Sequence, residues 1–588
     1  MNKFLSSPMI IILSLMFIIF SPLKLQAYVG GNITVNDIHY LVLTENSKTK
    51  TGTVAISGCS YNIAELTIPN SIKWKSFIYD VTSIKPNAFY KHPHLRSVII
   101  NNNVTSIGSS AFFECSTLSN MKIPDSVTYI GHSVFHGCCS LKNIELPESI
   151  TSINIGLFFQ CTELKRIVIP PNVTKIESYA FVECKSLTEV NIPDKVVSIG
   201  ENAFHSCSSL KNVTIGKSVI SIEDKAFYEC GSLNSIIIPD SVKLIGKEVF
   251  SQCENLMNIV VPDTVQEIGK DIFYHCKKLP PILFSKGGRI LLHYSSLNPA
   301  KSYTISNNVT SIASSAFYQC HNLKNIVIPD SITYIGGAAF QYCDNLPKII
   351  FSKNGKILVR YTDSYKRTSY TIPDTVTYIA GSAFEDSFWL NDIKIPDSVT
   401  EIGDYAFYMC ENLKSIDIPD SVEKIGNHAF CGCERLNRVH IGKGVNVIGD
   451  WAFAQCIDLM NIEIPNNVVS IGNRVFFNCD KLQNIEIPDS VSIIGKYAFY
   501  HCDSLKNATI GKNVTSLGQY AFSECHSLRN VYYKGDVPTK MDHNWESNGI
   551  YYQTTMKITS HYPEGNETWK NAIVNGMWEY NETSPWNP

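Results

Sequence analysis

The chain of 588 residues has no strong excess of either charge and no long apolar run beyond its first 27 residues. Its formal net charge is -3, and charged residues make up 18% of it. A nucleic-acid-binding protein normally presents a clearly basic face, so we expect no nucleic-acid partner. Because no second apolar stretch follows, we also expect no transmembrane segment after cleavage of the leader.

The first 27 residues have the order of a secretory signal peptide. Lys3 precedes an apolar run from Met9 to Phe20, Pro22 interrupts it, and Ala27 ends the segment on a small residue. The run is shorter than the roughly 20 residues that span a bilayer, which disfavours the alternative of a membrane anchor. We therefore predict export through a cleaved signal peptide, to the medium or the cell surface.

The chain lacks the paired two-cysteine knuckles of a zinc site, although it contains 19 cysteines. Sixteen of them recur at one position of a repeat, and neither Cys138-Cys139 nor Cys431-Gly-Cys433 has zinc-ligand spacing. We predict that the recurring cysteines are buried free thiols that act as small apolar groups. The alternative is a disulfide between cysteines of stacked coils, because the α-carbons of such neighbours would lie within the range that a disulfide permits. We expect no metal and no cofactor.

The dominant feature is an internal repeat, marked by a Phe that usually follows Ala. Every interval between markers is 23 residues except two of 44. A fixed period of this length is typical of a solenoid, in which each coil contacts only its neighbours. The markers are Phe89, Phe112, Phe135, Phe158, Phe181, Phe204, Phe227, Phe250, Phe273, Phe317, Phe340, Phe384, Phe407, Phe430, Phe453, Phe476, Phe499 and Phe522.

One copy shows how a coil is expected to fold. Ile326 and Ile328 alternate on one face of a short strand, which Pro329 ends because proline cannot donate to a ladder. Further apolar residues point inward on the return path. No single coil could bury these groups, so we expect equivalent residues of stacked coils to form continuous internal ladders.

The motif L-x-x-I-x-I-P-x-x-V-x-x-I-G-x-x-A-F-x-x-C resembles the BspA-type leucine-rich repeat of bacterial surface proteins and some parasitic protists, over residues 66 to 535. The resemblance implies a right-handed, curved repeat solenoid, mainly β. Its parallel β-sheet would lie on the concave face, with short irregular or 3-10 segments on the convex face. Six other residues replace the Gly after the return Ile, so we predict that this position does not need a left-handed backbone. They are Lys85, Asn154, Glu177, Glu223, Ala313 and Ala380.

The repeat divides the chain into four parts. We predict a signal peptide at 1–27, an N-terminal cap with a first incomplete repeat at 28–80, the solenoid at 81–535, and a C-terminal cap and tail at 536–588. A solenoid needs such caps because its core is exposed at both ends.

Two inserts, at about 280–305 and 347–372, account for the 44-residue intervals. A Gly-Gly or Asn-Gly pair in each predicts a hairpin. Each insert is either a modified coil or a hairpin projecting from one edge. Inserts in repeat arrays often lie on a binding face, and a structural spacer is the alternative.

Histidines and aspartates recur too regularly to mark one catalytic site. A Cys-His nucleophilic site would need a histidine base within reach of a thiolate. The histidines near repeat cysteines are His136, His205, His275, His321, His501 and His526. The aspartates that follow the strand-ending Pro would brace turns, with calcium binding as the alternative: Asp125, Asp194, Asp240, Asp263, Asp330, Asp397, Asp420 and Asp489. An enzyme needs one irregular constellation, so we expect no catalytic residues.

Each strand also has one position between its two inward-facing isoleucines that should face solvent on the concave sheet. The middle coils carry apolar residues there, and the later coils carry mostly acidic ones. Exposed apolar area often marks a partner site, although Val and Ile suit any strand. The candidate ligand-binding residues are Ile237, Val260, Val327, Lys394, Asp417, His440, Glu463 and Glu486.

Together these features predict a secreted or surface-displayed binding protein and not an enzyme. The resemblance implies an adhesin for a protein or glycan on host or neighbouring cells, such as an extracellular-matrix protein. One alternative is a self-associating surface-layer protein without an external ligand. Another is a hydrolase with a site in the inserts. The oligomeric state is not predicted.

Overall fold

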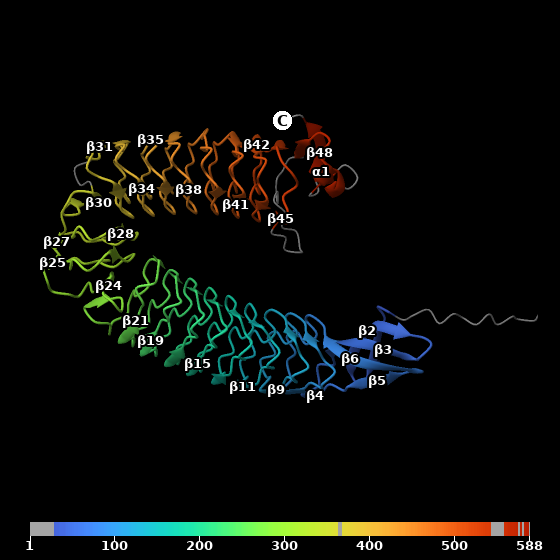
Figure 1. Cartoon of the computed structure of the whole chain (residues 1–588). Coiled ribbons are helices and arrows are strands. Elements are labelled where there is room, and N and C mark those ends of the chain that lie inside the picture. The colour runs from blue at the N-terminus through green and yellow to red at the C-terminus, as the bar shows by residue number, and fades with distance from the viewer. Residues whose placement is uncertain (1–28, 363–366, 542–557, 574–576, 579–580, 587–588) are drawn as a thin grey trace, which may run out of the picture. The chain divides into compact units, whose positions relative to one another are not determined.

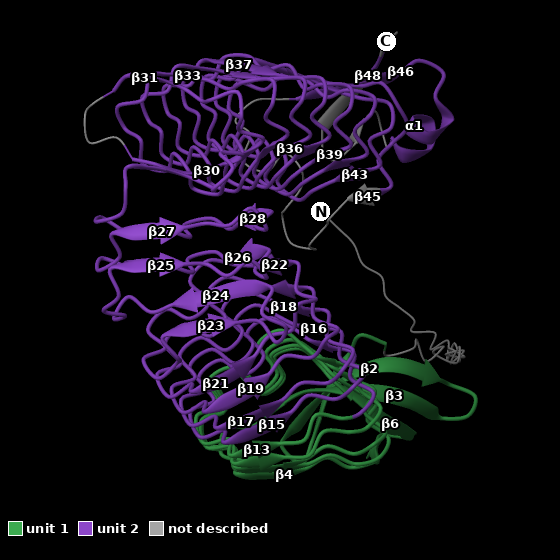
Figure 2. Ribbon diagram, turned by 60° about the vertical axis from the view of Figure 1, so that its left-hand side comes forward, with its two compact units in different colours: residues 1–170 green, residues 171–588 purple. Residues whose placement is uncertain are grey.

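The computed structural model describes residues 29–362, 367–541, 558–573, 577–578 and 581–586. The predicted signal peptide lies outside these residues. The chain divides into two compact units, unit 1 at residues 1–170 and unit 2 at residues 171–588 (Figure 2). Both consist of stacked β coils, and the described residues contain one helix, α1 (Glu567–Ala572) (Figure 1). The predicted repeat solenoid is therefore confirmed.

An ordinary coil contributes two strands, named here the A strand and the B strand. The A strand lies before the Pro of the repeat, as β19 (Ser235–Ile237) lies before Pro239. The B strand lies directly before the Gly of the repeat, as β20 (Leu244–Ile245) lies before Gly246. Equivalent strands of successive coils pair in parallel, with Ser235 opposite Asn258 and Leu244 opposite Glu267. This register joins residues 23 positions apart, so each period of the sequence is one turn of the solenoid.

The strands of unit 1 fall into three groups. Its A strands are β4 (Glu65–Thr67), β7 (Ser97–Ile99), β9 (Asn120–Lys122), β11 (Asn143–Ile144) and β13 (Arg166–Ile167). Its B strands are β8 (Ser106–Ile107), β10 (Tyr129–Ile130) and β12 (Ser152–Ile153). The strands at its N-terminal end are β1 (Asn32–Val35), β2 (Ile38–Asn46), β3 (Thr51–Cys59), β5 (Ser71–Trp74) and β6 (Phe77–Ile84). They join the B strands through β6; among them β3 and β6 pair in parallel, and the other pairs are antiparallel.

The A strands of unit 2 are β15 (Glu189–Asn191), β17 (Asn212–Thr214), β19, β21 (Asn258–Val260), β23 (Ile282–Phe284), β25 (Ser302–Thr304), β27 (Asn325–Val327), β29 (Ile349–Phe351), β31 (Ser369–Thr371), β33 (Asp392–Lys394), β35 (Ser415–Ile418), β37 (Arg438–Ile441), β40 (Asn484–Glu486), β42 (Asn507–Ile510) and β44 (Asn530–Tyr533). The strands β46 (Thr559–Pro563), β47 (Met577–Trp578) and β48 (Asn581–Trp586) extend the last of these sheets.

The B strands of unit 2 are β14 (Lys175–Ile176), β16 (Ser198–Ile199), β18 (Ser221–Ile222), β20, β22 (Glu267–Ile268), β24 (Ile290–Tyr294), β26 (Ser311–Ile312), β28 (Tyr334–Ile335), β30 (Ile357–Tyr361), β32 (Tyr378–Ile379), β34 (Glu401–Ile402), β36 (Lys424–Ile425), β38 (Val447–Ile448), β39 (Ser470–Ile471), β41 (Ile493–Ile494), β43 (Ser516–Leu517) and β45 (Lys540–Met541).

A ladder of stacked phenylalanines runs through the core of each unit. In unit 1 the Phe89 and Phe112 rings lie 4.9 Å apart and nearly parallel. In unit 2 the Phe453 ring lies 5.2 Å from Phe430 and 5.8 Å from Phe476. These side chains are fully buried, and offset stacking at such distances adds to the free energy of burial.

The recurring cysteines belong to the same core. The structure contains all 19 cysteines as free thiols, and the sixteen at the repeat position are buried. Each repeat thiol whose bond is defined donates to the carbonyl of the core aromatic residue in the preceding coil, as Cys456 Sγ does to Phe430 O at 3.3 Å and Cys320 Sγ does to Tyr294 O at 3.5 Å. The prediction of buried free thiols is confirmed, and the bond explains why a small group with a weak donor suits this position.

Each 44-residue interval contains an additional coil of 21 residues. Tyr294 follows Phe273 by 21 positions and precedes Phe317 by 23. Its N–H donates to Ala316 O at 2.7 Å and its ring lies 5.0 Å from Phe317, as a core Phe would. Tyr361 repeats this arrangement with Ala383 and Phe384. The inserts are therefore modified coils, and we name residues 274–294 and 341–361 thin coils 1 and 2.

A thin coil differs from an ordinary coil in two places. Its A and B strands form an antiparallel hairpin, β23 with β24 and β29 with β30. Only three positions separate Leu291 from the core Tyr294, whereas five separate Ile245 from Phe250. In ordinary coils that longer turn holds a left-handed residue two positions before the Phe, such as Tyr405 with φ 59°. The thin coil therefore lacks the turn that follows the B strand.

Coils on either side of a thin coil touch each other where this turn is missing. Across thin coil 1, Ser314 Oγ donates to Ile268 O at 2.8 Å. Across thin coil 2, Tyr378 Oη donates to Ile335 O at 3.1 Å. At each thin coil the stack is therefore shorter by one coil, about 4.8 Å, on the side of the turns that follow the B strands, but not on the side of the A strands.

Unit 2 consequently bends toward its B strands. Within this unit, one cleft is lined mainly by residues in or directly after B strands of two groups of coils, among them Leu244–Gly246 and Lys424–Gly426. Figure 1 shows β34 and β38 on the inner side and β31 and β35 on the outer side. The resemblance implied a parallel β-sheet on the concave face; the B strands on the inner side of this bend pair in parallel, and the A strands lie on its outer side. The reason is the two-residue deletion in each thin coil.

The Gly after the return Ile is not left-handed, in agreement with the prediction. A Cβ added to Gly246 would lie 2.5 Å from Asp224 N in the preceding coil, so close coil approach is what favours Gly there.

Candidate binding surfaces

The eight predicted ligand-binding residues all face solvent on the A strands or, for Glu463, in the equivalent position beside a single bridge. Ile237 is 68% exposed, Val327 44% and Val260 37%. The five remaining residues, Lys394, Asp417, His440, Glu463 and Glu486, are exposed as well. The alternating pattern therefore placed these side chains correctly with respect to solvent, on the outer side of the bend.

The eight residues do not form one continuous row. Ile237 and Val260 are direct neighbours in the sheet β15–β17–β19–β21. Val327 belongs to the separate two-stranded sheet β25–β27, because thin coil 1 lies between the two. Asp417 and His440 are paired, with His440 Nε2 4.0 Å from Asp417 Oδ1. The exposed residues of the A strands therefore form separate patches, with a boundary at each thin coil.

A second row, which the sequence interpretation missed, runs beside the B strands of unit 2. Six consecutive coils place a flat side chain two positions before the core Phe: Tyr405, His428, Trp451, Arg474, Tyr497 and Tyr520. Ring centroids are 4.5 Å apart for the first pair and 5.5 Å for the second. Arg474 lies 4.8 Å from the Trp451 ring and 4.5 Å from the Tyr497 ring. The 23-residue spacing of these residues was the signal that could have revealed it.

This stacked row stabilises the coils and leaves little ring face for a ligand. The rings between the two ends of the row have a neighbour on both faces, and Lys270 Nζ caps the Tyr405 end, 3.4 Å from that ring centroid. Burial, with the charges of Lys247 and Lys270, lowers the pKa of His428 to about 3, so this ring is neutral at physiological pH. Ligands that stack on aromatic faces therefore have no platform here.

The cleft inside the bend has a volume of about 840 Å³. Lys270 is one of its lining residues; its Nζ lies 3.7 Å from Glu385 Oε1, and Gln341 donates to the same carboxylate at 2.9 Å. Burial lowers the pKa of Lys270 and raises the pKa of Glu385, and each charge opposes the shift of the other. This pair joins coils on either side of the thin coils, so its geometry indicates a clasp for the bend.

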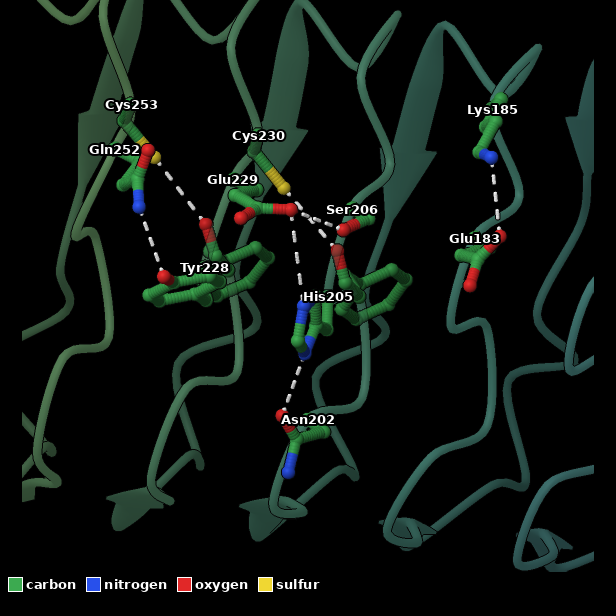
Figure 3. Close-up of polar contacts among 12 residues, drawn as sticks. Glu183, Lys185, Asn202, His205, Ser206, Tyr228, Glu229, Cys230, Gln252 and Cys253 are labelled. Atoms are coloured by element: carbon green, nitrogen blue, oxygen red, sulfur yellow. Dashed lines mark hydrogen bonds and ion pairs between the residues drawn. The ribbon is translucent and has the colours of Figure 1, made fainter.

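The Cys-His pairs considered from sequence are not formed where the contacts are defined. Figure 3 shows His205 between Asn202, 2.7 Å away, and Glu229, 3.9 Å away. The Cys230 thiol points instead to the carbonyl of Phe204 at 3.2 Å. The Ser206 hydroxyl donates to Glu229 at 2.6 Å, so the nearby histidine does not act on it as a base.

Burial also works against thiolate chemistry. It raises the pKa of Cys115 and of Cys276 to about 12. A nucleophilic cysteine needs the opposite shift, because the thiolate is the reactive form. Cys115 and Cys276 are accordingly structural groups, whereas the hydrogen bond from Cys320 lowers the pKa of the buried Cys343 thiol.

The aspartates after the strand-ending Pro brace the following coil. The Lys217 N–H donates to Asp194 Oδ1 at 3.2 Å, and the Lys443 N–H donates to Asp420 Oδ1 at 2.7 Å. Among the described residues, no three His, Cys, Asp or Glu side chains gather closely enough to hold a metal ion. A search of the same residues finds no helix with the length and apolar character to cross a bilayer.

Comparison with known proteins identifies the family of the repeat. The family model of the BspA type leucine rich repeat region matches residues 82–211, 174–296, 292–362, 359–479 and 448–555. A leucine rich cell surface protein from Faecalibacterium prausnitzii A2-165 is 23% identical, with 87% of this chain and 98% of that chain covered and a TM-score of 0.31. A leucine-rich repeat protein from Bacteroides ovatus ATCC 8483 is 24% identical over 87% of this chain and 99% of its own, with a TM-score of 0.29.

A third similar structure is the pneumococcal vaccine antigen PcpA, 17% identical over 95% of this chain and 100% of its own, with a TM-score of 0.24. No curated protein matches the chain.

Proposed function

The chain belongs to the BspA-type leucine-rich repeat family, and on this premise we propose that it is an exported adhesin. It would bind a macromolecule of a host or neighbouring cell through the outer surface of its A strands. The observation that carries the proposal is the exposure of Ile237 and Val260 side by side on one sheet. Isolated exposed apolar side chains are ordinary, but adjacent ones on a regular strand surface are typical of partner sites.

The acidic residues of later coils support the same role. Asp417, Glu463 and Glu486 recur on the outer surface of coils whose other outward positions are polar. Such a surface would steer and orient a basic partner more than it would hold it. Asp417 Oδ1 lies 4.0 Å from His440 Nε2, and Glu486 Oε1 lies 2.8 Å from Lys534 Nζ. We therefore propose that Ile237 and Val260 supply most of the affinity for the partner, and that the acidic residues orient the partner as it approaches.

The test is binding of the purified mature protein to immobilised extracellular-matrix proteins and to host cells. The double variant Ile237→Ser/Val260→Ser should lose most of the binding, and Glu463→Lys/Glu486→Lys should slow association. Matched controls on the B side are Ile220→Ser and Glu423→Lys, at exposed positions that precede B strands. Unchanged binding by both outer-surface variants would reject the assignment. Self-association detected by light scattering, with no external ligand, would favour a surface-layer protein.

A further inference from the structure

Thin coil 1 leaves a pocket that thin coil 2 does not leave in the same form. The pocket has a volume of about 330 Å³ and lies between the turn 271–276 and the turn 314–319, two coils further on. Leu292 and His293 of thin coil 1 line it where the missing turn would have been. Leu297, which also lines it, is 81% exposed, so the pocket opens to solvent. Its size falls in the range of small-ligand sites.

The walls of this pocket are mostly apolar, but two buried acceptors have no partner. Ile272, Phe273 and Leu292 are buried apolar lining residues. Asp271 Oδ1 and Ser315 Oγ are buried without a hydrogen-bond partner, and Ser315 as a residue is only 9% exposed. Nearly all buried polar atoms in proteins are hydrogen-bonded, so these two call for an occupant that donates.

The positive groups near the pocket are engaged elsewhere. Lys277 Nζ lies 2.6 Å from Glu254 Oε1, and Lys270 lies 3.7 Å from Glu385 and over the Tyr405 ring. His275 packs edge-on against Tyr274 at 4.1 Å. Burial lowers the pKa of His293 to about 4, so this side chain is neutral at physiological pH. The charge of Asp271 acts on Lys270 from a longer distance, but no Lys, Arg or His nitrogen of the described residues forms an ion pair with the Asp271 carboxylate within 4.0 Å.

The equivalent space at thin coil 2 is filled by the chain's own cation. Arg360 stands where thin coil 1 has His293, is 9% exposed, and donates through Nη1 to Cys343 O at 2.8 Å. The cavity there is smaller, about 230 Å³. Ala338 replaces Asp271, and Glu385 replaces Tyr318. At thin coil 2 this space is therefore occupied by the Arg360 side chain, which has an apolar stem and a positively charged end.

We propose that the pocket at thin coil 1 binds an alkylammonium group, with Asp271 as its counter-ion, Ser315 as a second acceptor and the apolar walls around its stem. A metal ion is not the occupant we propose, because no three His, Cys, Asp or Glu side chains of the described residues gather closely enough to hold one. The same chemistry is present in a free alkylamine and in the lysine side chain of a protein. The site is separate from the outer-surface patches of the proposed function, so either can fail without the other.

The experiment is calorimetric titration of the full chain with three probes: n-hexylammonium, Nα-acetyl-lysine methylamide and neutral n-hexanol. We expect the hexylammonium ion to bind at least about tenfold more tightly than hexanol, since a buried charged hydrogen bond is worth roughly that factor. Binding of the lysine derivative as well would extend the source to a protein side chain. Binding of hexylammonium alone would restrict it to small amines.

Three variants make the assignment specific. Asp271→Asn should weaken hexylammonium binding about tenfold or more, and His293→Arg should abolish it by filling the pocket as Arg360 does. Asp344→Asn, at the pocket of thin coil 2, is the matched control and should change nothing. If Asp271→Asn unfolds, as thermal melting would show, His293→Arg remains decisive. Equal affinity for amine and alcohol, no binding of either, or binding that survives both variants would overturn the proposal, and so would a crystal structure with the amine in which only water meets Asp271.

Discussion

An ordinary coil and a thin coil of unit 2 bury the same kind of residue in the same ladder but differ on one side. Tyr294 makes the backbone bond and the ring stacking that a core Phe makes, so thin coil 1 is a full member of the core. It lacks two residues between its B strand and its core aromatic. The difference teaches that stacking depends on the inward residues, whereas the direction of the bend depends on the length of one turn.

Lengthening the turn of thin coil 1 should have the largest effect. Insertion of Gly-Asp after Leu291 would restore an ordinary turn and separate Ser314 from Ile268, so we expect a straighter unit 2. Small-angle X-ray scattering should then show a larger radius of gyration and maximum dimension. The same dipeptide inserted after the exposed Leu297 is the control and should leave both unchanged. An unaltered scattering curve for the first insertion would refute this origin of the bend.

Removal of one core ring should be the next largest effect. Phe453→Ala in an ordinary coil deletes a fully buried ring between two stacked neighbours, and we expect a cost of roughly 3 to 5 kcal/mol. Because each coil contacts only its neighbours, hydrogen exchange should show lost protection near residues 430–476 first. Uniform loss of protection along the whole chain would contradict local coupling.

The thiol ladder should make the ordinary coils sensitive to alkali. Burial raises the pKa of Cys115 and Cys276 to about 12, whereas an unfolded thiol ionises near pH 8.5. The unfolded state therefore loses protons that the folded state keeps, and stability falls as pH rises through this window, by up to about 1.4 kcal/mol per pH unit per thiol. Chemical denaturation at several pH values above 8 measures the slope. Cys276→Ala should make it shallower, and an identical slope would contradict the role of this thiol.

The smallest expected effect distinguishes the core aromatic of the two kinds of coil. The Tyr294 hydroxyl is buried without a hydrogen-bond partner, unlike the hydroxyl-free Phe of an ordinary coil. Tyr294→Phe should therefore stabilise the chain by up to about 1 kcal/mol, because a buried polar group without a partner is unfavourable. Thermal melting measures the change, with Tyr318→Phe as the control. Destabilisation by Tyr294→Phe would show that this hydroxyl has a partner after all.

Part of the candidate site could be predicted from the sequence. Alternation in a strand fixes which side chains face out, so Ile237 and Glu486 were assigned to solvent correctly from their place between inward isoleucines. The patches they form could not be predicted. Sheet pairing breaks at the thin coils, which separates Val260 from Val327 although the pattern treats them alike.

The solenoid, its period and most of its inward residues could be predicted without coordinates, because each of these follows from a local pattern that repeats. Only the tertiary structure decided the rest. Tyr294 and Tyr361 were recognised as core residues from their ring contacts with the Phe of the next coil. The bend of unit 2 toward its B strands and the pocket beside Asp271 depend on contacts across the thin coils, between residues 46 and 43 positions apart. Such contacts are set by how short turns pack against one another, which no single coil specifies.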